Sequence, residues 1–425
     1  MLNRISAPQL QLLDKIKIIE AQKVVLDNGL PLFAINAGTQ DLVKLEFVFP
    51  AGDVHQPAGV ISSATAHLMD DGTATKSAAQ IAETFDFYGA SLEAESDFHE
   101  GALVLYTLNK FLEPTLDLLL ELLTEATFPQ HEIDNYVKRQ CNQLLVSNEK
   151  VDYLARKHFR SALFGNHPYG NTAEIEDYKA LQQNELLHFF KSNYNLAHGT
   201  LIVSGKVNDH TIALINKKVG SVKLVPSVLM QPDAAGKNVP SSAPARQFFE
   251  KENAVQSAIR IGKIMVNRKH DDYKRLTILN TVLGGYFGSR LMSNIREDKG
   301  YTYGIGSNLI SNIYSGNFVL ATEVGTEVRS AALEEIYKEI GLLSREPIGT
   351  EELNLVKNYM NGAFLRSLDG PFGLAQRFRT LFTNDLTYDY YYDYLETLKA
   401  TTSEELLLLA QKYFQADSFT EVIVG

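Results

Sequence analysis

Apolar and polar residues alternate over residues 43–49, which is typical of a strand with one buried face. Ala51-Gly52 ends this strand, and Gly89 stands where a left-handed residue would end a later helix. Apolar residues at helical spacing predict helices over 61–69, 78–88, 114–126 and 133–149. Two further strands are predicted between these helices, over 91–98 and 102–108.

A similar order of elements returns in the second half of the chain. Gly89-Ala90-Ser91-Leu92 falls on Gly300-Tyr301-Thr302-Tyr303, so the two halves are offset by about 210 residues. The predicted strands of this half are 257–266, 301–309 and 317–323. The predicted helices are 271–283, 290–297, 328–342 and 351–368. The repetition indicates an internal duplication of one α+β unit.

The composition changes between residues 231 and 246, where prolines occur together with glycine and serine. Such a stretch is typical of a linker. We therefore predict two domains, residues 1–222 and 247–425, joined by a linker over 223–246.

Composition excludes several classes of protein. The 425 residues carry a net charge of −11, which argues against a protein that coats nucleic-acid phosphates. The only cysteine, Cys141, excludes an intramolecular disulfide and a cysteine-rich metal site. The sequence has neither a signal-peptide pattern nor a run of about 18 apolar residues. We expect a soluble protein of the cytoplasm or periplasm, with no membrane partner.

The ten histidines form no metal motif of their own. No two of them stand three or four residues apart, the spacing at which two imidazoles on a helix can meet one ion. His131-Glu132 resembles the start of an H-E-x-x-H motif, but Asn135 replaces the second histidine. Phosphate-binding glycine loops and the G-x-S-x-G elbow of serine hydrolases are also missing.

The segment 284–306 carries the most information about chemistry. Arg296 falls near the end of a predicted helix, Gly300 ends that helix, and Tyr303 falls in the strand that follows. A corner of this kind can fold a guanidinium and a phenol toward each other, and both can donate hydrogen bonds to one carbonyl oxygen. In the alternative interpretation, Arg296 pairs with Glu297 or Asp298 and Tyr303 lies in the core.

This segment resembles the second-half signature of the pitrilysin/insulinase-like zinc peptidases, in the branch that contains mitochondrial processing peptidase. The family pattern is G-G-x-x-x-S-R-L-x-x-x-[IL]-R-x-x-x-G-x-x-Y, and the matching residues are Gly284, Gly285, Ser289, Arg290, Leu291, Ile295, Arg296, Gly300 and Tyr303. Further likenesses are Leu26-Asp27-Asn28-Gly29, Gly72-Thr73 before a helix that ends in Gly89-Ala90, and His167-Pro168-Tyr169-Gly170. The resemblance implies two similar domains, each a mostly antiparallel sheet covered by helices on one face, that form half of a clamshell.

Active members of this family bind zinc through H-x-x-E-H and a distal glutamate, and the glutamate inside the motif acts as general base. Alignment on Gly72-Thr73 places Ser63, Ala66 and His67 at the three motif positions, and alignment on 167–170 places Gln143 at the distal glutamate. A shifted register using His67, Asp70 and Asp71 breaks the spacing to Gly72-Thr73. The resemblance therefore implies no metal in this chain.

Some members of the family are heterodimers in which one chain holds zinc and the other supplies the arginine and tyrosine. This sequence resembles the second kind of chain. The resemblance implies a homologous zinc-bearing partner, a peptide substrate, and a role for Arg296 and Tyr303 in binding the scissile carbonyl while the partner supplies zinc. Alone, the chain is expected to be inactive. A different possibility is a non-catalytic structural or substrate-holding subunit, like the zinc-less chain of processing peptidase or the respiratory-complex core proteins.

Overall fold

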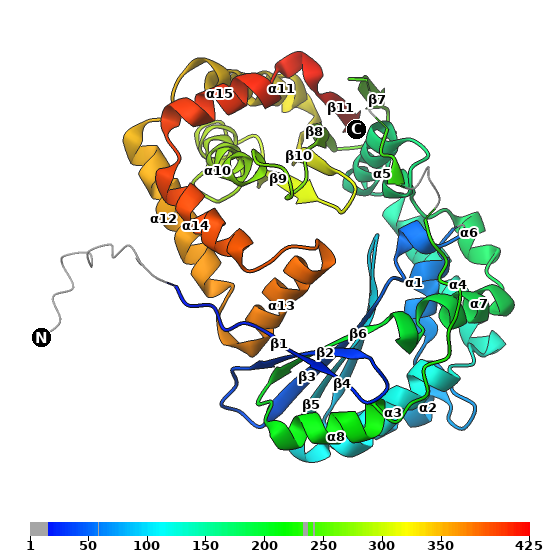
Figure 1. Ribbon diagram of the computed structural model, residues 1–425. Helices are drawn as coiled ribbons and strands as arrows, with labels where there is room; N and C mark the ends of the chain where they lie inside the picture. Colours follow the sequence, from blue (N-terminus) through cyan, green and yellow to red (C-terminus); the bar gives the residue numbers. More distant parts are fainter. Residues whose placement is uncertain (1–15, 58, 233–236, 241–242) are drawn as a thin grey trace, which may run out of the picture.

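Two sheets, one in each half of the chain, form the framework of the computed structural model (Figure 1). It describes residues 16–57, 59–232, 237–240 and 243–425. Residues 1–15, where the absence of a leader is predicted, and parts of the predicted linker, 233–236 and 241–242, lie outside the described residues.

The first sheet has the strand order β1-β2-β6-β3-β5-β4. Its strands are β1 (Gln22–Val25), β2 (Pro31–Asn36), β3 (Leu42–Phe49), β4 (Ser91–Ser96), β5 (Gly101–Leu108) and β6 (Thr200–Gly205). Only the β2–β6 pair is parallel, and the four other pairs are antiparallel. β4 is an edge strand, and its residues alternate between exposed and partly buried.

The second sheet repeats this plan with the order β7-β11-β8-β10-β9. Its strands are β7 (Arg246–Phe249), β8 (Gln256–Met265), β9 (Ile305–Ser311), β10 (Gly316–Gly325) and β11 (Thr420–Val424). Again only one pair is parallel, β7 with β11. This pair includes the edge strand, whereas the parallel pair of the first sheet lies one strand further in. The hairpins also correspond, because Ser96 pairs with Gly101 as Ser311 pairs with Gly316. The sheets therefore support the internal duplication predicted from the sequence.

Helices surround both sheets, some packed directly on the strands and others on neighbouring helices. In the first half they are α1 (Ile61–Leu68), α2 (Ala78–Tyr88), α3 (Leu112–Glu125), α4 (Gln130–Ser147), α5 (Val151–Phe164), α6 (Ile175–Lys179), α7 (Gln183–Asn193) and α8 (Asp209–Val219). In the second half they are α10 (Tyr273–Leu283), the π-helix η5 (Met292–Asp298), α11 (Arg329–Arg345), α12 (Thr350–Arg366), α13 (Gly370–Thr383), α14 (Asp389–Ala400) and α15 (Ser403–Tyr413). No helix within the described ranges combines the length and apolarity needed to cross a bilayer.

The two halves exchange helices across their interface. α13 from the second half lies on the open face of the first sheet, where Phe378 packs on Phe33 with ring centroids 4.7 Å apart (Figure 1). α5 from the first half packs on β8 and β11, and His158 stacks on Phe249 at 3.8 Å. Each sheet is thus covered on its second face by a helix of the other half, which the expectation of helices on one face did not include.

The loops of the two equivalent hairpins meet where the halves join. His99 Nε2 lies 2.7 Å from the Tyr169 hydroxyl and 3.4 Å from the amide nitrogen of Ile313. The amide of Tyr314 donates to the same Tyr169 oxygen at 3.2 Å. Burial lowers the pKa of His99 to about 4, so its ring is neutral near pH 7 and Nε2 can accept both hydrogen bonds.

Most predicted elements are present within a few residues of their expected bounds, and Gly89 ends α2 with a φ of 60°. Near Tyr303, one expectation is wrong and another is met in an unexpected form. The predicted strand over 301–309 begins only at Ile305, so Tyr303 lies in irregular structure before it. The predicted helix over 290–297 is a π-helix, in which the amide of Lys299 donates to the carbonyl of Asn294.

Candidate functional site

Three of the four degenerate zinc positions lie on α1, which packs against β4, β5 and α7. Ser63 donates its hydroxyl to the Val60 carbonyl at 3.1 Å, and the side chain of Ala66 is fully buried. His67 is exposed, and its Nδ1 donates to the Ser63 carbonyl at 2.8 Å. Gln143 is exposed on α4. Only His67 among the four has a side chain that ordinarily binds zinc.

These residues do not fit a zinc ion. Structural and catalytic zinc sites take three or four ligands from nitrogen, sulfur and carboxylate oxygen. In the described part of the chain, no three His, Cys, Asp or Glu side chains are grouped so that they could hold a metal. Asp70 and Asp71 follow α1, and burial raises the pKa of both, to about 6 for Asp71. They form no such group with His67.

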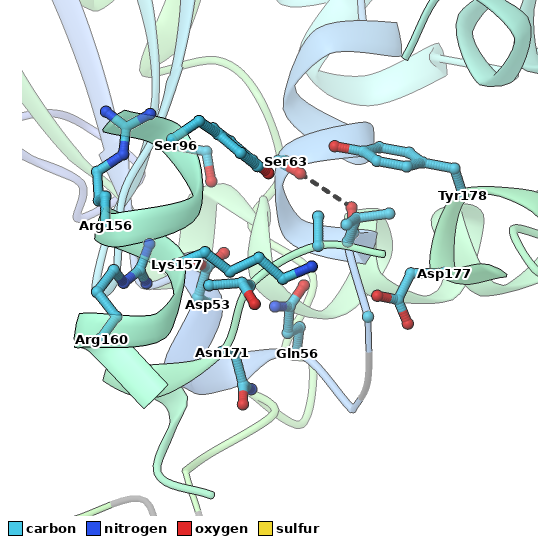
Figure 2. Close-up of a pocket in the computed structure, with 15 residues that line it drawn as sticks. Asp53, Gln56, Ser63, Ser96, Arg156, Lys157, Arg160, Asn171, Asp177 and Tyr178 are labelled. Atoms are coloured by element: carbon cyan, nitrogen blue, oxygen red, sulfur yellow. Dashed lines mark hydrogen bonds between the residues drawn. The ribbon is translucent and has the colours of Figure 1, made fainter. Parts of the chain in front are cut away.

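A cavity of about 610 Å³ lies beside the degenerate motif, and Ser63 forms part of its wall. Figure 2 shows Arg156, Lys157 and Arg160 of α5 on one side of this cavity, with Ser63 and Tyr178 across from them. Lys157 forms an ion pair with Glu174 at 2.5 Å, whereas Arg156 is exposed and lies over the Tyr153 ring. The cavity thus presents cations, carboxylates, hydroxyls and amides beside the degenerate motif.

Asp53 is a partly buried acid in the wall of this cavity. Burial raises its pKa to about 6, against the opposing effects of the Arg160 charge and a hydrogen bond from Ser62. Arg160 is itself fixed, because its Nε donates to the Tyr169 carbonyl at 3.1 Å and its guanidinium lies 5.1 Å from the Phe98 ring centroid. The three cations of α5 were missed by the sequence argument, although their spacing at 156, 157 and 160 already places them on neighbouring turns of one helix.

Arg296 lies on η5, in the second half. Its guanidinium is stacked over the Phe287 ring, 4.7 Å from the centroid, and Phe287 is itself 64% exposed. Within the described residues Arg296 forms no ion pair, so the expected alternative of pairing with Glu297 or Asp298 is not observed. The charge of Arg296 is therefore held by an aromatic ring and available to another group.

Tyr303 follows η5 and is 94% exposed, so the alternative that it lies in the core is wrong. The neighbouring Thr302 anchors the segment, because its hydroxyl donates to the Glu323 carbonyl of β10 at 2.7 Å and the Gly304 amide donates to it at 3.1 Å. The anchored segment directs the phenol of Tyr303 away from the protein. No hydrogen bond joins Arg296 to Tyr303 among the described residues.

Other residues of the same signature have packing roles. Ser289 is 1% exposed, and Arg290 donates from Nε and Nη2 to the two carboxylate oxygens of Glu352, both at 2.8 Å. A side chain at Gly284 would lie 2.5 Å from the Ser307 hydroxyl oxygen. These residues hold the π-helix and β9 against the rest of the second half, and so they fix the place from which Arg296 and Tyr303 extend.

Two similar α+β units, a motif helix with one zinc-type side chain, and an arginine without an ion pair followed by an exposed tyrosine define a peptidase-like protein with degenerate zinc positions in its described residues. The model for insulinase (peptidase family M16) matches residues 38–176, and the model for the peptidase M16 inactive domain matches residues 180–360. The chain belongs to the M16 peptidase family.

Some relatives of this chain are named as zinc proteases and another is named as a non-peptidase homolog. The chain is 24% identical over 355 residues to the uncharacterized zinc protease YmxG of Bacillus subtilis, covering 82% of this chain and 84% of that one. It is also 24% identical over 308 residues to the non-peptidase homolog YmxG of Helicobacter pylori, covering 70% and 68%. The crystal structure of the peptidase M16 inactive domain from Pseudomonas fluorescens has the same fold, with a TM-score of 0.86, 20% identity and coverage of 95% and 98%.

Proposed function

We propose that this chain is the metal-free subunit of a two-chain M16 peptidase and supplies Arg296 and Tyr303 to the carbonyl oxygen of a peptide. A homologous partner with an intact H-x-x-E-H motif would hold the zinc. The observation that carries this proposal is that both groups are available to a ligand: Tyr303 is 94% exposed, and the partly buried Arg296 has no carboxylate partner in the described part of the chain.

The chemistry of the two side chains suits this role. When a peptide bond is attacked, negative charge develops on its carbonyl oxygen, and a guanidinium and a phenol both donate hydrogen bonds to such an oxyanion. Stacking on Phe287 limits the motion of the Arg296 guanidinium before substrate arrives. The irregular segment that holds Tyr303 is fixed by Thr302, so closure against a partner needs little movement of the backbone.

A second candidate is a substrate-holding subunit with no part in the chemical step. The cavity beside Ser63 favours it, because an open volume of about 610 Å³ persists where the metal ligands are gone. In this case the peptide would be bound by the polar groups of the cavity, and Arg296 and Tyr303 would not affect the rate once the substrate is bound.

Reconstitution distinguishes the two candidates. The chain would be purified alone and together with an M16 chain that carries the intact motif, and both samples would be assayed with a library of unfolded peptides. We expect activity only in the mixture. Tyr303→Phe and Arg296→Gln should each lower kcat by about 10²–10³-fold, the effect of removing one oxyanion donor.

Matched substitutions serve as controls. Tyr88→Phe removes a phenol whose ring packs on Phe111, and Arg345→Gln removes an exposed arginine at the end of α11. Neither should change kcat. Full activity in the Tyr303→Phe and Arg296→Gln complexes would reject the catalytic role and leave the substrate-holding role. Peptide cleavage by the purified chain alone would reject both.

A further inference from the structure

A second cavity, of about 340 Å³, lies among α10, α12, α13 and α14 of the second half. Half of the twelve residues that line it are aromatic: Tyr273, Tyr359, Phe364, Tyr390, Tyr391 and Tyr394. Tyr359 also packs on Tyr286, with ring centroids 4.8 Å apart, so the cavity adjoins the glycine-rich segment before Arg296. Its size and aromatic lining are typical of sites for small molecules.

Two arginines, Arg268 and Arg377, also line this cavity, and the lining contains no aspartate or glutamate. Such an excess of positive charge is unusual in a chain with a net charge of −11. Each guanidinium is oriented through Nε, which donates to Ser311 at 3.3 Å for Arg268 and to Ser367 at 2.8 Å for Arg377. Neither forms an ion pair within the described residues.

Arg379, two residues further along α13, is a buried arginine that forms ion pairs, and it serves as a comparison for Arg377. It is 8% exposed and lies within 3.6 Å of carboxylate oxygens from three residues, Glu46, Glu95 and Glu100. Burying a cation in this way is favourable only when opposite charges accompany it. Arg377 and Arg268 are partly buried without such partners, which is the arrangement expected when the anion comes from a ligand.

Tyrosine hydroxyls add neutral donors to the two cations. The Tyr391 phenol interacts electrostatically with both guanidiniums. Arg268 also interacts in this way with Tyr390, and Arg377 with Tyr394. The phenols of Tyr390 and Tyr394 form no hydrogen bond within the described residues. Burial raises the pKa of Tyr394 to about 12, so it keeps its proton near neutral pH and can donate it to an oxyanion.

We propose that this cavity binds a small organic anion, with its carboxylate or phosphate group between Arg268 and Arg377 and its aromatic or aliphatic body against the tyrosine rings. The planar fork of arginine favours oxyanions that accept two hydrogen bonds. The site is distinct from the arginine–tyrosine corner and does not rest on the function proposed above, because it needs neither a partner chain nor peptide cleavage.

Calorimetric titration of the full chain tests this site. The probes are N-acetyl-phenylalanine, phenyl phosphate, N-acetyl-phenylalanine amide and inorganic phosphate. We expect at least one of the two aromatic anions to bind, more weakly as salt is raised. The amide lacks the charge and inorganic phosphate lacks the ring, so both should bind at least tenfold more weakly than that anion. The tighter of the two anions identifies the head group as carboxylate or phosphate.

Substitutions then locate the binding. Arg268→Gln and Arg377→Gln should each weaken the bound anion by about ten- to a hundredfold, the loss expected for a charged hydrogen bond. Arg377→Lys should recover only part of the affinity, and Arg345→Gln should leave it unchanged. Thermal unfolding shows whether each variant is folded. If Arg377→Gln does not fold, the affinity of Arg268→Gln decides the test. Failure of both aromatic anions to bind, equal binding of the amide, or full affinity in Arg268→Gln would overturn the proposal.

Discussion

The two halves of this protein contain the same corner, a helix followed by a glycine and an edge strand, with different outcomes. In the first half, α2 is a regular helix with a capping box at Ser77, and Gly89 leads almost directly into β4. In the second half, a π-helix ends near Gly300 and an irregular segment precedes β9 at Ile305. Leu92, the sequence counterpart of Tyr303, packs on the core, whereas Tyr303 is 94% exposed.

The comparison teaches that a duplicated unit can keep its fold in both copies while only one copy displays functional groups. The backbone requirement is the same, because both glycines have a left-handed conformation, with φ of 60° and 66°. The two corners differ in the residues added before the strand of the second corner and in the type of helix that precedes it. The first corner follows an α-helix, and the second follows a π-helix, a form that is frequent at functional sites. The first corner is also tied to the opposite half through Glu95 of β4 and Arg379.

The largest effect is expected from breaking that tie. Arg379→Met leaves the buried carboxylate of Glu100 without its cation and leaves Glu46 with Lys44 alone, which should destabilise the chain by about 3–5 kcal/mol. The midpoint of urea unfolding measures the change. Arg366→Met, at an exposed position at the end of α12, is the matched control and should change stability by about 0.5 kcal/mol or less. Equal midpoints for the two variants would show that the first corner is not held by Arg379.

The second largest effect is expected on the activity of the complex when Tyr303 of the second corner is replaced. Tyr303→Leu introduces the residue found at the equivalent position of the first corner. Because Tyr303 is exposed, thermal unfolding of the isolated chain should be almost unchanged. Activity of the complex with a zinc-bearing partner should fall by about 10²–10³-fold. If the chain loses stability instead, Tyr303 has a structural role that its exposure does not reveal.

A pH dependence is expected at the junction of the two hairpins. The pKa of His99 is lowered to about 4 in the folded chain, so the unfolded chain binds an additional proton between pH 6.5 and 4. The contribution of His99 is complete above pH 6.5 and is lost as the pH falls toward 4, by roughly 3 kcal/mol. Asp53 and Asp71 have raised pKa values and act in the opposite sense.

The contribution of His99 is therefore measured as a difference. Unfolding midpoints of the natural chain and of His99→Gln would be compared from pH 4 to 8, because the effects of the two aspartates cancel in this comparison. The stability advantage of the natural chain should shrink as the pH falls below 6.5. A difference that does not depend on pH would mean that His99 keeps the same protonation state in the folded and unfolded chain.

The smallest effect is expected from the two glycines. Gly89→Ala and Gly300→Ala should each destabilise the chain by about 1–2 kcal/mol, because alanine is disfavoured in the left-handed region. A Cβ at either position would meet no atom within 4 Å, so the cost is confined to the backbone. In the complex, only Gly300→Ala should also lower kcat, since it displaces the segment that carries Tyr303. Equal loss of activity in both variants would remove the distinction between the corners.

Local patterns in the sequence predict much of this fold. The strand predicted over 43–49 and the helix predicted over 78–88 are present as β3 and α2, and Gly89 is correctly placed at the end of its helix. The expectation that only one face of this strand is buried is wrong, because Lys44 and Glu46 are buried as well. β6 was missed because all of its residues are buried and it shows no alternation. The exchange of α5 and α13 could not be predicted, because an apolar helix face has the same pattern whichever sheet it covers.

The candidate sites also contain some residues that the sequence predicts and some features that depend on the tertiary structure. Ser63, Ala66 and Gln143 were identified from spacing to short motifs, and their side chains alone exclude a zinc site of the usual kind. The exposure of Tyr303 could not be predicted, because it depends on where β9 begins. The cavity around Arg268 and Arg377 was not predicted either, since its lining residues are separated by more than a hundred positions and meet only in the tertiary structure.

The exchange of α5 and α13 also bears on how the chain can be divided. A proline-rich connection with few contacts ordinarily invites a cut between independent parts. Here a cut near residue 240 would separate Phe33 and its neighbours from α13, which packs on them. It would also separate Phe249 from α5, which packs on it. Each fragment would expose an apolar sheet face, which favours aggregation over independent folding. The two halves are thus repeats in architecture that rely on each other's helices to cover their sheets, so we expect soluble fragments only when both are expressed together.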